Sequence, residues 1–247
     1  MFKCRYKRFH AGIFKGAIRK MKYRLFIQSL ILMMILPLVS AQEPAKQPFR
    51  ISFGIDGGIN LQTLTGNDYW GEALDNRVVA GYDGGVNIII PVLPDLFLQP
   101  GIMIIKKGAK QDIISDNIVK KVNLLYLAVP LDILFRPQAG NGHLLLGAGP
   151  FAALGLTGKE TTKSGPASTE LKVRFLADAS GEPTTYVYYK AIDAGLDLLF
   201  GYEFYSNIYF RLNSQIGLFK INSDYGLPND RTSKKNLGFG ISTGYRF

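Results

Sequence analysis

The sequence is poor in cysteine and histidine. Its one cysteine, Cys4, lies in a basic and apolar N-terminal segment, and of its two histidines only His143 lies beyond that segment. The remainder of the chain therefore has no disulfide, no thiol nucleophile, no cysteine-bound metal and no cysteine that a lipid could acylate. We expect it to be stabilised by a packed core or by a membrane.

Most of the chain also lacks a net basic charge. Residues 1–41 carry nine of the 29 lysine and arginine residues and none of the 19 aspartate and glutamate residues, which leaves 20 basic against 19 acidic residues. The high isoelectric point is thus a property of the N-terminal segment alone. We expect no nucleic-acid partner, because a nucleic-acid-binding domain needs its own basic patch.

No apolar run is long enough for a membrane-spanning helix, which needs about 20 residues. The longest, 25–39, follows a basic start and precedes small residues, which is typical of a signal peptide cleaved after Ala41. We predict a leader and signal peptide over 1–41, with Met21 as the true start, and a periplasmic linker over 42–50. An uncleaved anchor is the alternative.

Beyond residue 50 the apolar residues recur with a period of two, and no segment has a helical stripe. One face of each segment is aliphatic, and the other mixes glycine, amide and charged residues, as Ile55 and Ile59 alternate with Asp56 and Asn60. The segments that qualify as strands are 51–61, 77–90, 95–108, 119–136, 143–156, 188–203, 207–219 and 235–247.

The strand lengths and connections favour a membrane barrel over a soluble sandwich, which would show the same alternation. The strands exceed the about five to six residues of a globular strand. Short and long connections alternate, as in outer-membrane barrels. We therefore predict an all-β fold, an eight-stranded antiparallel up-and-down transmembrane β-barrel over 51–247, located in the outer membrane.

Aromatic residues gather at the expected strand ends, as in the aromatic girdles of membrane barrels. The girdle at the periplasmic side would comprise Tyr202, Phe204, Tyr205, Tyr209, Tyr245 and Phe247, and the opposite girdle would include Tyr186, Tyr188, Tyr189 and Phe219.

The last strand, GFGISTGYRF (238–247), is expected to close the barrel against 51–61, because lipid excludes an open sheet edge. An ordinary edge strand is the alternative. Tyr245 and the terminal Phe247 resemble the signal that barrel-assembly machinery recognises, which makes that machinery an expected partner during biogenesis. Export places the short connections in the periplasm and makes 157–187 the largest external loop.

Five stretches resemble the PorT-like outer-membrane β-barrel family: GIDGGINL (54–61), LQPGIMIIKKG (98–108), YLAVPLDILFR (126–136), GAGPFAALG (147–155) and LGFGISTGYRF (237–247). The resemblance covers the region after the signal peptide. It implies an eight-stranded barrel and, for the best-known members, a link to protein secretion at the cell envelope.

Two positions depart from that family's pattern. Gly101 and Ala128 stand where the family usually has glutamates that point inward, so this sequence lacks those two acids. Asp132 has the same inward parity as Ala128 and could substitute in part.

Alternation directs a set of polar side chains into the barrel. An eight-stranded barrel is only wide enough for its side chains to fill it, and buried charges must be paired. We therefore predict a packed salt-bridge and amide network that conducts little, with an ion path as the alternative. The predicted network comprises Asp56, Asp83, Gln99, Asp132, Arg136, Asp193, Asp197, Arg211, Gln215 and Arg246, joined by Asn60 and Asn87.

Other candidate chemistry is weaker. GAGPFA (147–152) has dinucleotide-fingerprint spacing but no helix or βαβ context, so no cofactor is expected. The acidic pieces 66–70, 111–117 and 221–230 lack the spacing of a calcium loop, so no metal is expected.

The sequence predicts a non-enzymatic structural or accessory barrel that contacts outer-membrane lipid and a secretion-system or envelope protein. Two alternatives are a lipid-modifying enzyme and a small-solute pore. His143, the one available histidine base, lies at a periplasmic turn, away from outer-leaflet lipid, which disfavours the enzyme.

Overall fold

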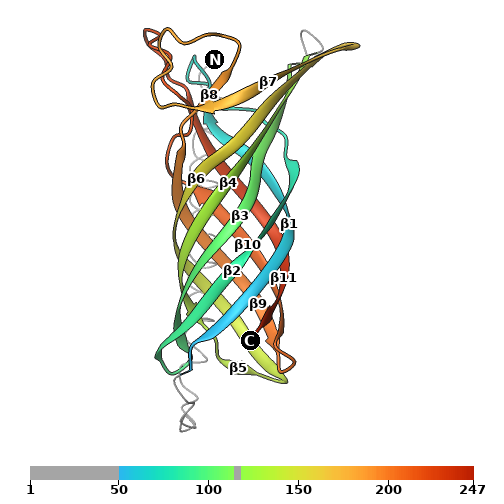
Figure 1. Cartoon of the computed structure of the whole chain (residues 1–247), viewed down its shortest axis with the longest axis vertical. Coiled ribbons are helices and arrows are strands. Elements are labelled where there is room, and N and C mark those ends of the chain that lie inside the picture. The colour runs from blue at the N-terminus through green and yellow to red at the C-terminus, as the bar shows by residue number, and fades with distance from the viewer. Residues whose placement is uncertain (1–49, 114–117) are drawn as a thin grey trace, which may run out of the picture. The chain divides into compact units, whose positions relative to one another are not determined.

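The computed structural model describes residues 50–113 and 118–247 (Figure 1). Regular structure in these ranges consists of β-strands. Over the same ranges, no helix is long and apolar enough to cross a membrane. The predicted signal peptide, the Met21 start and nearly all of the predicted linker lie outside the described residues.

Eight strands form a closed ring in which every neighbour is antiparallel. The order is β4-β3-β2-β1-β11-β10-β9-β6, and pairing of β4 with β6 closes it. The predicted eight-stranded barrel is confirmed. Its strands are β1 (Ser52–Asn67), β2 (Val79–Leu93), β3 (Leu96–Ile113), β4 (Ile118–Phe135), β6 (Gly142–Ser164), β9 (Ile192–Phe204), β10 (Ile208–Gly217) and β11 (Ser233–Arg246).

The last strand of the ring pairs with the first, as predicted. β11 pairs with β1 from Gly54 opposite Arg246 to Asn67 opposite Ser233. The N–H of Phe247 also donates to the carbonyl of Phe53 at 2.7 Å. This ladder removes the two edges that an open sheet would leave unpaired.

The outer surface of the ring is apolar and the inner surface is polar. In β1, Ile59 is 72% exposed, whereas its neighbour Asn60 is 4% exposed and points inward. Large exposed apolar side chains recur on every strand of the ring. An exposed apolar surface of this extent is typical of contact with lipid.

Two apolar clusters lie inside the barrel, one toward each end. The first includes Leu134, Leu145 and Leu199, and the second includes Leu124 and Phe151. The polar network described below lies between and among them, so the interior is filled by side chains, as an eight-stranded barrel allows.

The two ends of the barrel differ in their connections. At the short-turn end, β2–β3 and β9–β10 are joined through Asp95 (φ 58°) and Asn207 (φ 66°), and β4 and β6 are joined through the short β5 (Gln138–Ala139) and Gly140 (φ 56°). Asparagine, aspartate and glycine tolerate this left-handed backbone, which a tight turn requires. The opposite, long-loop end carries the longer connections (Figure 1).

The predicted loop 157–187 is wrong as a description of this segment. β6 continues to Ser164 and turns at Gly165 (φ 55°) into β7 (Ala167–Phe175), which pairs in parallel with β8 (Val187–Tyr189). The predicted strand 188–203 therefore begins inside β8. Most residues of the hairpin are polar, and the apolar alternation of Leu171, Val173 and Phe175 on β7 is short, so periodicity did not reveal the hairpin.

Three residues predicted to belong to the girdles point elsewhere. Tyr209 is 0% exposed and lies inside the barrel, and Tyr188 and Tyr189 are also buried. Tyr209 shares its parity along β10 with the inward-facing Arg211, and this parity decides its direction. Tyr245 and Phe247 remain on the outer surface at the short-turn end.

Prolines interrupt the ladder on three neighbouring strands. The β3–β4 pairing skips from Pro100 opposite Leu131 to Met103 opposite Ala128. The β4–β6 pairing skips the positions next to Pro130, and Pro150 faces that gap from β6. Proline has no N–H to donate, so these strands have fewer ladder hydrogen bonds there.

Candidate functional sites inside the barrel and at its long-loop end

Nearest the short-turn end, one glutamate binds two arginines. Glu203 accepts hydrogen bonds from Arg136 Nη2 at 2.6 Å and from Arg246 Nε at 2.8 Å. Its side chain is 1% exposed. Arg246 also donates to Asn87 Oδ1 at 3.3 Å. These contacts tie β9 to β4, β11 and β2 across the barrel.

A second group surrounds Asp56. Its Oδ1 pairs with Arg211 Nη2 at 2.6 Å. Its Oδ2 accepts hydrogen bonds from Asn87 Nδ2 at 2.7 Å and from the Tyr209 hydroxyl at 3.0 Å. Asn87 belongs to both groups, so the two groups form one continuous network.

A third group lies toward the long-loop end. Lys107 Nζ pairs with Asp193 Oδ2 at 2.9 Å, and both side chains are 0% exposed. Asp193 also accepts a hydrogen bond from Asn236 Nδ2 at 2.9 Å. The ammonium of Lys107 lies 4.5 Å from the ring centroid of Phe151 and 5.5 Å from that of Tyr126. Aromatic faces and a carboxylate thus take the place of the water that would surround the ammonium of an exposed lysine.

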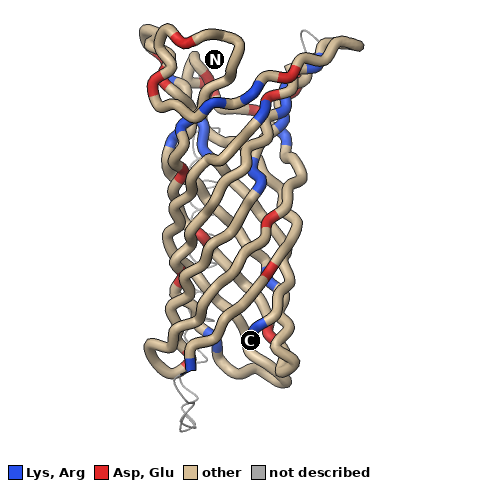
Figure 2. The backbone as a smooth tube through the Cα atoms, viewed as in Figure 1, with Lys and Arg blue, Asp and Glu red and all other residues tan. Residues whose placement is uncertain are grey.

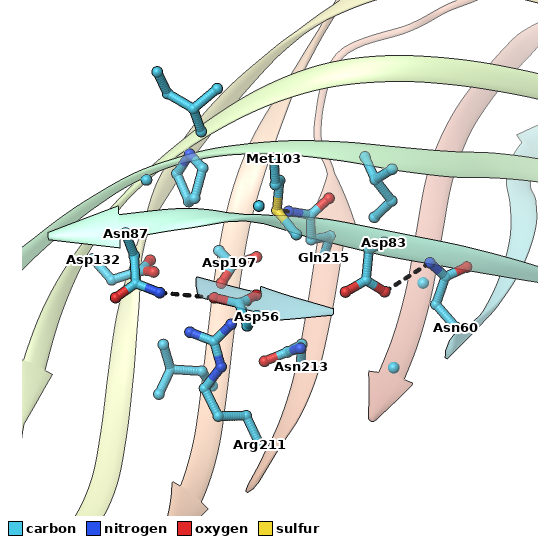
Figure 3. Close-up of a pocket in the computed structure, with 18 of the residues that line it drawn as sticks. Asp56, Asn60, Asp83, Asn87, Met103, Asp132, Asp197, Arg211, Asn213 and Gln215 are labelled. Atoms are coloured by element: carbon cyan, nitrogen blue, oxygen red, sulfur yellow. Dashed lines mark hydrogen bonds and ion pairs between the residues drawn. The ribbon is translucent and has the colours of Figure 1, made fainter. Parts of the chain in front are cut away.

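A cavity of about 50 Å³ lies beside the second group (Figure 3). Asn60 donates to Asp83 Oδ1 at 2.9 Å at its wall. Several buried oxygens of its lining have no hydrogen-bond partner among the described residues: Asn60 Oδ1, Gln62 Oε1, Asp83 Oδ2, Asp132 Oδ1 and Gln215 Oε1. The cavity has room for a few water molecules, since each needs about 10–15 Å³.

The interior holds more acids than bases. Six carboxylates are buried, against the buried cations Lys107, Arg211 and Arg246 and the partly exposed Arg136. The carboxylates without an ion pair to another described residue lie at the cavity; they are Asp83, Asp132 and Asp197.

The ten side chains predicted to form the network all point into the barrel. Nine are buried, and Arg136 is partly exposed at the short-turn end. Sequence reasoning omitted Lys107 and Glu203, which complete the ion pairs. Glu203 lies an even number of residues from Asp193 and Asp197 along β9, so strand alternation already indicated that its side chain points inward. Lys107 follows an apolar run and is adjacent to Lys106, so the sequence did not show which of the two lysines points into the barrel.

At the long-loop end, three connections are hydrogen-bonded into a cap, which comprises residues 68–78, 176–186 and 218–232. The backbone N–H of Ala179 donates to the Asp224 carbonyl at 2.6 Å. The hydroxyl of Tyr69 donates to the Pro228 carbonyl at 2.8 Å. Hydrogen bonds from Ser180 lower the pKa of the Asp178 carboxyl. The cap is therefore an ordered surface, and Trp70 stands 73% exposed on it.

A larger cavity of about 360 Å³ lies at the same end. We call it the vestibule. It combines tyrosine rings with lysine and glutamate side chains, and a pocket of this size and mixed lining is suited to a small ligand or a peptide side chain. Its polar and aromatic lining includes Lys120, Glu160, Glu182, Tyr186, Tyr188, Tyr189, Tyr225 and Lys234.

The segments considered above as cofactor or metal sites have structural roles. The segment 147–152 lies within strand β6, so it has no helix to hold a pyrophosphate. The acids of the loops at 66–70 and 221–230 accept turn hydrogen bonds, as Asp68 does from Trp70 and Glu72. In 50–113 and 118–247, no group of three or more potential ligands could hold a metal ion.

His143 lies in the β5–β6 hairpin at the short-turn end, where it pairs with Gln138. Its ring stands edge-on to Tyr205, with centroids 6.0 Å apart. This is a packing contact, at the end of the barrel away from the vestibule.

The sequence model of the protein family named outer membrane protein beta-barrel domain matches residues 40–223. No curated protein shows significant sequence similarity to the chain. Among solved structures, Ail of Yersinia pestis, crystallised with the heparin analogue sucrose octasulfate, is 14% identical (80% of this chain, 99% of that chain, TM-score 0.39). Neisserial surface protein A is 10% identical (79% and 95%, TM-score 0.39). The OprF barrel domain of Pseudomonas aeruginosa is 12% identical (79% and 98%, TM-score 0.34).

Proposed function

The chain belongs to the outer membrane protein beta-barrel domain family, and on that premise we propose that it is a non-enzymatic accessory barrel. The ring anchors the protein in the outer membrane. The cap and the vestibule contact a partner protein of the envelope. Outer-membrane barrels have short periplasmic turns and longer outer loops, so the long-loop end faces the cell exterior.

The filled interior is the observation that carries this proposal. Side chains of the three charged groups cross the barrel, and the cavity beside them has a volume of only about 50 Å³. A small-solute pore needs a continuous aqueous path, which this packing does not offer. The network favours a rigid anchor over a conduit.

The cap supports a contact with protein. Its loops are already ordered by hydrogen bonds, so binding would cost little further ordering. Trp70 and Leu227 are more than half exposed on the described loops, and large exposed aromatic side chains are typical binding anchors. A lipid-modifying enzyme is less well supported, because His143 lies at the opposite end of the barrel.

We extend the proposal to an accessory role in protein secretion. The five stretches that resemble the PorT-like family support this extension by analogy alone. We also propose that Tyr245 and Phe247 form the signal read by the assembly machinery. Both are exposed, and their rings stand edge-on with centroids 5.0 Å apart.

Photo-crosslinking in living cells tests the proposed contact. A photoreactive residue would replace Trp70 or Leu227 on the cap, and Ile59 on the lipid-facing wall as the matched control. Ile59 is 72% exposed, close to the 73% of Trp70. We expect a discrete protein adduct from the cap positions and none from Ile59. An absence of protein adducts at both cap positions would contradict a stable extracellular contact.

The identity of the adduct tests the secretion role separately. A component of a secretion apparatus, together with a reduced set of secreted proteins in a deletion strain, would support it. An unrelated envelope protein and unchanged secretion would exclude it and leave the accessory role in place.

A further inference from the structure

A groove of about 420 Å³ opens on the outer wall of the barrel at the long-loop end. We propose that this groove, here called the lysine groove, binds the phosphate groups of an outer-leaflet lipid. Among the described residues, no acid contributes to its lining. The lining consists of Lys106, Val119, Lys121, Asn123, Lys159, Thr161 and Lys163, from β3, β4 and β6.

The strand register places these lysines on the lipid-facing side. Lys106 is two residues beyond the outward-facing Ile104 on β3. Lys121 stands directly opposite Thr161 on β6, so Lys159 and Lys163 are its two diagonal neighbours. Side chains at such positions on one face are about 7–8 Å apart, and one phosphate group can contact more than one of them.

The height of the groove matches the headgroup region of the membrane. Lys106 lies ten residues beyond Leu96, where β3 begins. With a rise of about 3.3 Å per residue and a tilt of about 40°, ten residues climb about 25 Å, the height of the apolar band of such barrels. The lysines therefore begin where the lipid chains end, while Ile104 and Leu154 below them contact the chains.

The charge of the groove is largely uncompensated within the described residues. Lys159 pairs with Glu170 at 2.9 Å. Lys106, Lys121 and Lys163 form no ion pair with another described residue. Like charges on neighbouring strands repel one another. A lipid phosphate would relieve that repulsion and supply an acceptor for each ammonium.

Basic residues gather at this end of the barrel as a whole (Figure 2), so a general attraction to anionic lipid has to be separated from a site. The groove differs from the rest of the rim because it is concave, spans three neighbouring strands and continues into the apolar wall. Lys190, Lys220 and Lys235 carry the same charge at the long-loop end outside the groove lining. They provide a matched control.

The experiment measures retention of lipid by the purified full-length barrel. The probe is lipid A with two phosphates, compared with the same lipid A after removal of both phosphates, and native mass spectrometry counts the lipids that remain bound. The groove variant is K106Q/K121Q/K163Q, and the control variant is K190Q/K220Q/K235Q. Circular dichroism confirms that each variant keeps its β-structure.

We expect the groove variant to bind phosphorylated lipid A about a hundredfold more weakly than the unmodified barrel, since each of the three lysines contributes about a fivefold gain in affinity. The control variant should bind like the unmodified barrel. Equal losses in both variants would overturn the site, and equal retention of dephosphorylated lipid A would overturn phosphate recognition. Binding of inorganic phosphate as tight as that of lipid A would overturn the choice of a lipid as the ligand.

Discussion

At the scale of single residues, the interior distinguishes carboxylates that form ion pairs from carboxylates that do not. Asp193 forms an ion pair with the fully buried Lys107, whereas Asp132 has no ion pair with a described residue. Removing one partner of a buried ion pair leaves an unpaired charge and costs about 3–5 kcal/mol. Neutralising a buried carboxylate that has no ion pair removes the free-energy cost of burying its charge.

We therefore predict opposite outcomes for two matched substitutions. D193N should lower the free energy of unfolding by about 3–5 kcal/mol, and D132N should leave it unchanged or raise it. Urea unfolding of the barrel in lipid vesicles measures both. If D132N destabilises the barrel as much as D193N does, the assignment of unpaired charge to the cavity is wrong.

The inward direction of most residues of the network could be predicted from the sequence, but their partners could not. Strand parity placed Asp56, Asp193 and Arg211 inside the barrel. Pairing depends on the stagger of strands far apart in sequence, such as β3 and β9, which share no ladder. Tyr209 was predicted to belong to a girdle because its position near a strand end outweighed its parity.

At the scale of the strand, the prolines of β3, β4 and β6 mark a line across the barrel wall along which ladder hydrogen bonds are fewer. Pro100, Pro130 and Pro150 lie on adjacent strands, where the β2–β3, β3–β4 and β4–β6 ladders each skip pairs. Backbone groups without a ladder partner are protected less against opening than those in a complete ladder. The gap lies next to Gly101 and Asp132, both of which line the small cavity.

Amide hydrogen exchange should reveal this line. In detergent micelles, the amides of Gly101 and Asp132 should exchange about tenfold or more faster than those of the complete β1–β11 ladder, such as Asn60 and Ile241. Amide nuclear magnetic resonance follows the exchange residue by residue. Equal protection in both regions would show that the prolines do not weaken the wall.

The strands that cross the membrane were predictable because one face must be apolar throughout. Beyond the membrane that requirement ends, and the alternation of apolar and polar residues that reveals a strand is largely lost. The β6–β7 hairpin is held by cross-strand pairs of threonine, lysine and glutamate, such as Lys159 with Glu170 at 2.9 Å. The same composition occurs in solvated loops, so the segment was predicted to be a loop.

At the scale of the whole molecule, closure and filling act together. Closure gives every strand of the ring two neighbours, which the membrane requires. The charged groups then link strands of the ring that share no ladder, for example β3 and β9 through Lys107 and Asp193. A barrel built in this way is suited to hold the cap and the vestibule in fixed positions at the cell surface.

Single-channel recording tests this account most directly. The purified barrel would be inserted into a planar lipid bilayer under an applied voltage, and a porin added afterwards would confirm that the bilayer can report a channel. The account predicts no unitary current steps from the barrel, because the three charged groups and the apolar clusters fill its interior. Stable, reproducible conductance steps would contradict it and would favour a solute pore.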